Sequence, residues 1–161
     1  MIEHPIPPLY DKNSRVLILG SFPSVKSREQ RFFYGHPQNR FWRVIARIFD
    51  KEVPESLEEK KKLLYSMHIA VWDVIAACDI SGSSDSSIRN VVPNDLKIIL
   101  DNADIKQVFV NGKTAEKYFK KFIGKSLNIE AVCLPSTSPA NAARSFESLV
   151  EEWNIIKKYI N

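Results

Sequence analysis

The residues best suited to chemistry follow an apolar run near the start of the chain. Val16 to Leu19 is continuously apolar, and Gly20-Ser21-Phe22-Pro23-Ser24 comes directly after it. A second segment, 33–42, reads Phe-Tyr-Gly-His-Pro-Gln-Asn-Arg-Phe-Trp. A buried strand that ends in a Gly/Pro/Ser turn is typical of an open α/β sheet, which binds ligands outside the carboxyl ends of its strands. We therefore expect the functional site at this turn.

The side chains of these two segments suit a nucleobase. Aromatic rings stack on bases, and carboxamides place a donor beside an acceptor, a pair that can read a base edge. From the residues alone, packing in the core explains Phe32 and Phe33 as well as base stacking does. The aromatic and neutral polar residues concerned are Phe22, Phe32, Phe33, Tyr34, His36, Gln38 and Asn39.

Several other chemistries lack their motifs. The first loop has neither the Gly-Lys-Ser/Thr ending of a phosphate-binding loop nor the glycine spacing of a dinucleotide fingerprint. Ser21 and Ser24 are not framed as Gly-x-Ser-x-Gly, which disfavours a serine hydrolase. The three histidines lack zinc-ligand spacing, and the two cysteines match no metal-ligand or redox spacing. We expect no metal and no cofactor.

Length and charge indicate the class of protein and of partner. With 161 residues, 44% of them apolar, the chain predicts a single domain over 1–161 with a short N-terminal arm at 1–13. A pI near 9.0 and lysine clusters at 60–62, 120–121 and 157–158 permit a polyanionic partner, although solvated helix faces also explain each cluster. No signal peptide or membrane span is evident. We expect an intracellular monomer in the cytoplasm, associated with the nucleoid if the source is prokaryotic.

Four short apolar strands must position the polar loops. Helical patterns lie between them, including a capping box at Ser56 and Glu59. Residues 78–89 are too polar for a core and indicate a loop. The predicted strands are 15–19, 69–72, 108–110 and 131–134, and the predicted helices are 39–50, 56–67, 94–100, 114–123 and 142–159.

This alternation predicts an α/β fold in which helices cover both faces of a parallel sheet. Right-handed crossovers then bring the carboxyl ends of all four strands to one edge. That edge is expected to collect residues 20–24, 73–89, 111–112 and 136–141.

Three motifs at this edge resemble the uracil-DNA glycosylase superfamily. They are Gly20–Ser24, residues 33–42 and Pro135-Ser-Thr-Ser-Pro-Ala-Asn141. The resemblance spans residues 14–160 and is strongest to the hypoxanthine-DNA (deoxyinosine) glycosylase family. It implies a three-layer α/β/α sandwich around a four-stranded parallel sheet. It also implies an enzyme that flips a deaminated base out of DNA and hydrolyses its N-glycosidic bond without metal or cofactor.

The resemblance also implies residue roles. It places the catalytic amide on Asn39, whose position before Arg40 also makes it a candidate helix N-cap. Many members carry Asp or Asn where this chain has Phe22, and His in the last motif where this chain has serine and threonine. A carboxylate-driven mechanism at position 22 is therefore excluded.

The remaining candidates follow from the same motifs. We expect Phe22 with Phe33 or Tyr34 to stack on the base and Asn111 to read its edge, although Asn111-Gly112 also suits a strand-to-helix turn. The expected DNA-contacting residues, some of them near the gap left by the flipped nucleotide, are Ser24, Ser136, Thr137, Ser138, Asn141 and Arg144.

Two alternatives to hypoxanthine excision stay open. A uracil glycosylase acting on mismatched or single-stranded DNA is the first, because uracil and hypoxanthine both present a ring carbonyl beside an N–H. A non-catalytic nucleic-acid binder is the second, favoured by Phe22 and disfavoured by Asn39.

Overall fold

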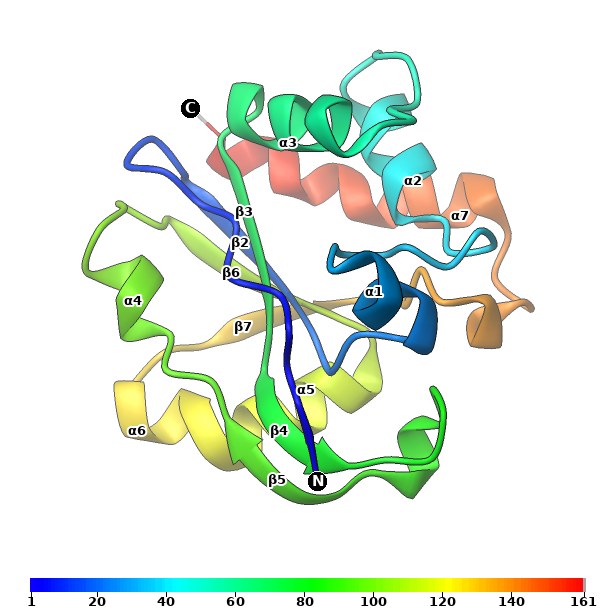
Figure 1. The fold of residues 1–161 in the computed structure, drawn as a ribbon. Helices are drawn as coiled ribbons and strands as arrows, with labels where there is room; N and C mark the ends of the chain where they lie inside the picture. The colour runs from blue at the N-terminus through cyan, green and yellow to red at the C-terminus, as the bar shows by residue number, and fades with distance from the viewer. Residues whose placement is uncertain (161) are drawn as a thin grey trace.

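A four-stranded parallel sheet forms the centre of the computed structural model, which describes residues 1–160 (Figure 1). Its strand order is β3-β2-β6-β7. Three of its strands are almost wholly apolar and buried, as expected of parallel strands covered on both faces. The strands are β2 (Val16–Gly20), β3 (Ile69–Asp73), β6 (Gln107–Asn111) and β7 (Ala131–Leu134).

Helices cover the two faces of this sheet, and the predicted three-layer α/β/α sandwich is confirmed. Figure 1 shows α2, α3 and α7 on one side and α5 with α6 on the other. The helices are α1 (Val25–Gln30), α2 (Phe41–Ile48), α3 (Leu57–Ser66), α4 (Lys97–Leu100), α5 (Lys113–Phe119), α6 (Lys125–Leu127) and α7 (Phe146–Trp153). None of the helices within residues 1–160 has the length and apolar character needed to span a bilayer.

A second, antiparallel sheet corrects the prediction that residues 78–89 form a loop. Its order is β1-β4-β5, with β1 (Ile2–Glu3), β4 (Ile75–Asp79) and β5 (Arg89–Pro93). Cys78 is fully buried at the end of β4, and Arg89 begins β5. Only the serine-rich stretch between them is a turn, and its polarity obscured the strands on either side.

The helix predicted from Ala142 begins four residues later. Residues Pro139–Asn141 form a 3-10 turn, and Ser145 caps α7 by accepting a hydrogen bond from the Ser148 N–H at 3.1 Å. Beyond Trp153 the chain continues as a 3-10 helix to Tyr159. The predicted helix at 94–100 is reduced to the single turn of α4. In contrast, the capping box is confirmed, because Ser56 Oγ accepts from the Glu59 N–H at 3.1 Å.

Candidate active site

The carboxyl ends of three adjacent strands place Asp73, Gly20 and Asn111 in one row. Gly20 pairs in register with Asp73, and the register that pairs Leu19 with Val110 puts Asn111 on the other side of Gly20. Neighbouring strands lie about 4.8 Å apart, so the Cα atoms of Asp73 and Asn111 are separated by roughly 10 Å. Side chains at equivalent positions point to the same face of a sheet. A carboxylate and a carboxamide therefore flank a position without a side chain.

Gly20 is required by this arrangement. A Cβ atom at position 20 would collide with Asp73 Oδ1 and would lie 3.4 Å from the Tyr34 hydroxyl. The absence of a side chain thus allows a carboxylate oxygen and a phenol to approach the same backbone position. In the free protein these two groups occupy the space above Gly20, and we refer to this position at the predicted edge site as the gap above Gly20.

Tyr34 extends over this gap. Its ring stacks on Phe41 with centroids 4.0 Å apart and planes inclined by 19°. Its hydroxyl is buried and has no hydrogen-bond partner within residues 1–160. Burial and, second, the negative charge of Asp73 raise the pKa of Tyr34 far above its usual value, while Asn111 has a smaller, lowering effect. The hydroxyl is therefore neutral, and it lies near both flanking groups.

A chain of hydrogen bonds joins Asn111 to Asn39 through Thr137. Asn111 Nδ2 donates to Thr137 Oγ1 at 3.0 Å, and the Thr137 N–H donates to Asn111 Oδ1 at 3.0 Å. The Thr137 hydroxyl in turn donates to Asn39 Oδ1 at 2.8 Å. Thr137 is fully buried, so these bonds have no competition from water. These hydrogen bonds therefore connect the three segments that carry Asn39, Asn111 and Thr137, which lie at or after the ends of three different strands.

The carboxamide of Asn39 is oriented by this network. Its Oδ1 accepts from the Phe41 N–H at 2.9 Å as well as from Thr137. A backbone N–H can only donate, so the atom that faces it is the oxygen, and both acceptor positions of this oxygen are occupied. Asn39 Nδ2 makes no hydrogen bond to the described part of the chain. Asn39 precedes Arg40, the N-cap residue of α2; its oxygen satisfies the first N–H of the helix, and its own N–H donors stay free.

Asp73 has a partner that the sequence did not indicate. His4 Nε2 lies 2.7 Å from Asp73 Oδ2, and both side chains are almost fully buried. His4 Nδ1 accepts the Ile6 N–H at 3.1 Å, so the ring hydrogen resides on Nε2 and is donated to Asp73. The two residues are 69 positions apart, and only the place of Asp73 at the end of an apolar strand hinted at a role.

The aromatic candidates separate into core and site residues. Phe33 is only 2% exposed and packs against Phe32 with ring centroids 5.7 Å apart. This position corrects the expectation that Phe33 stacks on a base, because its ring lies inside the core. Phe22 is half-buried, with its ring edge-on to His4 and the Arg28 guanidinium 5.6 Å from its centroid. Tyr34 is the aromatic residue that lies over the strand ends.

The predicted DNA-contacting residues also separate. Thr137 is inaccessible, which corrects its assignment to DNA contact: its polar groups are directed inward to Asn39 and Asn111. Arg144 is bound to Glu152 at 3.0 Å and to Ser148, so its charge is already partnered.

Four further candidates brace their own loops. Ser24 caps α1, Ser136 Oγ accepts from the Ser138 N–H, Ser138 Oγ accepts from the Ala140 N–H, and Asn141 Nδ2 donates to the Ser136 carbonyl. The Arg40 guanidinium donates to the carbonyls of Asn141 and Arg144 and so ties the last motif to the start of α2. These bonds hold the loop together, and the exposed, small and apolar residues Ala142 and Ala143 follow it.

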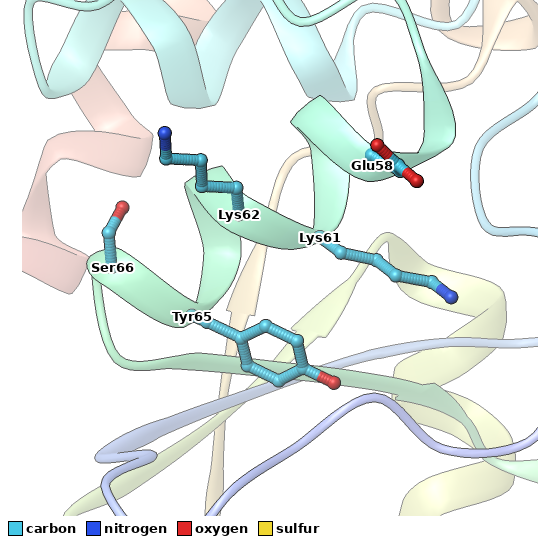
Figure 2. Close-up of a pocket in the computed structure, with 5 residues that line it drawn as sticks. All are labelled: Glu58, Lys61, Lys62, Tyr65 and Ser66. Carbon is cyan, nitrogen blue, oxygen red and sulfur yellow. The ribbon is translucent and has the colours of Figure 1, made fainter.

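A surface hollow on α3 is separate from this site. Figure 2 shows that its lining residues, Glu58, Lys61, Lys62, Tyr65 and Ser66, all come from that one helix. Lys60 and Lys61 lie 5.3 Å and 5.9 Å from the ring centroids of Trp42 and Phe32. The stems of these two lysines thus lie against aromatic rings, contacts that the solvated-face interpretation of this cluster did not include. Among residues 1–160, no group of three or more acidic, histidine or cysteine side chains could hold a metal ion.

Known proteins are similar to this chain in sequence and fold over almost their whole length. Residues 7–157 match the model of the Uracil DNA glycosylase superfamily. Two curated proteins named hypoxanthine DNA glycosylase are similar: one from Methanosarcina acetivorans is 32% identical and covers 99% of this chain and 100% of its own. The other, from Methanosarcina barkeri, is 33% identical over 95% of this chain and 96% of its own. A solution structure from Methanosarcina acetivorans, with the provisional name uracil DNA glycosylase, is 31% identical and gives a TM-score of 0.83 over 99% of both chains.

Proposed function

This chain belongs to the uracil DNA glycosylase superfamily, and we propose that it is the DNA glycosylase that removes hypoxanthine from deoxyinosine in DNA. Two relatives of nearly equal length carry the name hypoxanthine DNA glycosylase, which supports this choice of base. The observation that carries the chemistry is the oriented carboxamide of Asn39. Its oxygen accepts two hydrogen bonds, and its nitrogen donates none within the described residues. The protein is proposed to act as a monomer.

Asn39 acts as a donor to the departing base. Breaking the N-glycosidic bond places negative charge on the base, and a preorganised N–H directed at that charge lowers the barrier. The alternative, in which Asn39 orients the attacking water by accepting a hydrogen bond from it, needs a free lone pair on the amide oxygen. Both acceptor positions of Oδ1 are occupied by Phe41 and Thr137. Catalysis at this site therefore relies on positioning and on stabilisation of the leaving group.

The gap above Gly20 suits the lactam edge of hypoxanthine. This edge presents a carbonyl oxygen beside a ring N–H. Asp73 Oδ1 can accept from the ring N–H, and the second N–H of the Asn111 amide can donate to the carbonyl. Adenine reverses the donor and acceptor on this edge and is disfavoured. The Tyr34 hydroxyl lies beside both groups and makes no hydrogen bond within the described residues, so a base that enters here breaks no hydrogen bond of Tyr34.

Duplex contact is assigned to the strand-end loops. Ser24, Ser136, Ser138 and Asn141 keep their proposed place near the phosphate backbone. Small apolar side chains at the tip of the last motif suit entry into the gap that a flipped nucleotide leaves. Arg144 contributes by fixing this loop through Glu152 rather than by direct phosphate contact.

Product analysis with modified duplexes tests the function. The pure protein is incubated with end-labelled duplexes that contain deoxyinosine, deoxyuridine or deoxyxanthosine, and abasic sites are revealed by alkaline cleavage. Deoxyinosine is expected to give the fastest cleavage. Cleavage of the deoxyuridine duplex alone would favour the uracil alternative. Binding of all three duplexes without cleavage would favour the non-catalytic alternative.

Thr137→Val is expected to slow excision without loss of the fold. Valine fills nearly the same buried volume but removes both the donor to Asn39 and the acceptor for Asn111. We expect the single-turnover rate to fall by about tenfold and the free energy of unfolding to fall by about 1–3 kcal/mol, since buried polar groups lose their partner. Thr137→Ser keeps the hydroxyl and serves as the matched control. An unchanged rate in the valine variant would show that the network does not position the amide.

A further inference from the structure

We propose that His4, on the N-terminal arm, is a positioning residue of the active site, which holds Asp73 so that Oδ1 is presented to the ring N–H of the flipped base. This proposal rests on the proposed function. It assigns to the arm a part in base selection, although none of the three motifs that identify the family includes the arm.

The hydrogen bond between His4 and Asp73 has a defined direction and charge. Because His4 Nδ1 accepts from the Ile6 backbone, Nε2 is the donor to Asp73 Oδ2, and the ring is neutral while it donates. Within residues 1–160, His4 is the one side chain at ion-pair distance from this carboxylate. Asp73 therefore keeps its full acceptor strength, since no cation neutralises it.

The arm holds the His4 ring from both sides along the chain. Before it, β1 pairs with β4, and the His4 N–H donates to the Ala76 carbonyl at 2.8 Å. After it, Trp72 Nε1 donates to the Ile6 carbonyl at 3.3 Å, and Leu9 pairs with Val71.

Aromatic rings surround the imidazole as well. The ring centroids of Phe22, Phe33 and Trp72 lie 5.9, 6.3 and 6.4 Å from that of His4. A ring packed in this way has little rotational freedom, so the carboxylate that it binds is held in one orientation. This packing also gives Phe33, whose ring lies in the core, a structural role beside the site.

The other oxygen of Asp73 is directed to the proposed base position. Oδ1 lies against the place of a Gly20 Cβ, and no residue in 1–160 donates a hydrogen bond to it. The side chain as a whole is 94% buried, yet Oδ1 is not among the buried atoms that lack a partner, so this oxygen stays accessible to an incoming donor. A ring N–H that enters the gap would satisfy it. Adenine would place a ring lone pair there and would leave the oxygen unpaired.

The test couples a protein change to a change in the base. Excision by wild type and His4→Phe is measured on duplexes with deoxyinosine and with N1-methyldeoxyinosine, which lacks the ring N–H. Loss of a hydrogen bond to a charged group corresponds to a rate change of about 10- to 100-fold. We expect His4→Phe to slow deoxyinosine excision by about this factor and to leave the slower reaction of the methylated base unchanged. His4→Gln, whose amide can donate to Asp73, is expected to restore much of the deoxyinosine rate.

The outcomes distinguish this proposal from the proposed function. No deoxyinosine excision by the wild-type protein would overturn the proposed function itself. If His4→Phe slowed the excision of both bases by the same factor, His4 would only support the fold, and the positioning role would be overturned. Glu3→Ala, an exposed change on the same arm, controls for damage to β1.

A second measurement needs no variant and decides the matter if His4→Phe does not fold. Nitrogen NMR of the wild-type protein is expected to show His4 as the neutral Nε2–H form. This signal is expected to shift when a non-cleavable deoxyinosine duplex binds and to stay unchanged with an N1-methylated duplex. A hydrogen on Nδ1, or the same shift with both duplexes, would contradict the proposal.

Discussion

Replacing Asn39 by aspartate is expected to leave the protein folded and to lower the rate of hypoxanthine excision by about 100- to 1,000-fold. The carboxylate keeps an oxygen for the Phe41 N–H and for the Thr137 hydroxyl, and aspartate is a good cap at a helix N-terminus. The N–H donor is lost, however, and a negative charge faces the base as it becomes negative. A capping role alone would predict no loss of rate.

The comparison is made under single-turnover conditions with enzyme in excess, together with a thermal melt of each variant. Asn102→Asp makes the same chemical change at an exposed amide that bonds the Ile98 carbonyl, and its rate is expected to stay at the wild-type level. Asn39→Ala is expected to lose both activity and about 1 kcal/mol of stability, because the cap disappears as well. Full excision by a folded Asn39→Asp would remove Asn39 from the catalytic machinery.

Replacing Asp73 by asparagine is expected to reduce deoxyinosine excision by about 100-fold and to weaken the preference over adenine. In the variant, His4 Nε2–H binds the new amide oxygen, so the amide nitrogen takes the place of Oδ1. A donor then faces the ring N–H of hypoxanthine, and both groups lose their hydrogen bond. The same donor suits the ring lone pair of adenine.

The measurement is the ratio of single-turnover rates on deoxyinosine and deoxyadenosine duplexes, with duplex affinity determined separately. Asp79→Asn removes a carboxylate that contacts the N-terminus of the same arm and lies outside the gap, so its ratio is expected to match the wild type. If Asp73→Asn lowered the excision rates of both bases by the same factor, Asp73 would support the fold and would have no part in base selection.

The central sheet and its functional edge could be predicted from the sequence because they depend on local signals. Continuous apolar runs such as Val16 to Leu19 indicate buried parallel strands, and the polar residues that end each run must meet at one edge. The resemblance of the motifs added the family and the amide of Asn39. The matches over 7–157 and to the two hypoxanthine DNA glycosylases confirm that family and that enzyme class.

The direction of side chains could not be predicted, because it is decided by tertiary contacts. Thr137 lies in a loop of serines and prolines, a composition typical of an exposed loop. In the structure, however, the backbone N–H and the hydroxyl of Thr137 point inward and bond the side chain of Asn111. Phe33 follows the first motif but points into the core, and Tyr34 adopts a left-handed backbone conformation with φ of 53° beside it. His4 and Asp73 meet only because the arm pairs with β4, a strand that the polar turn after it concealed.

The central claim is that this protein releases hypoxanthine by cutting the bond between base and sugar. The most direct test is to quantify free hypoxanthine and abasic sites from one deoxyinosine duplex after a single turnover with the wild-type protein. The account predicts one free hypoxanthine for every abasic site and an otherwise intact strand. Abasic sites without free hypoxanthine, or a cleaved strand that still carries the base, would contradict it.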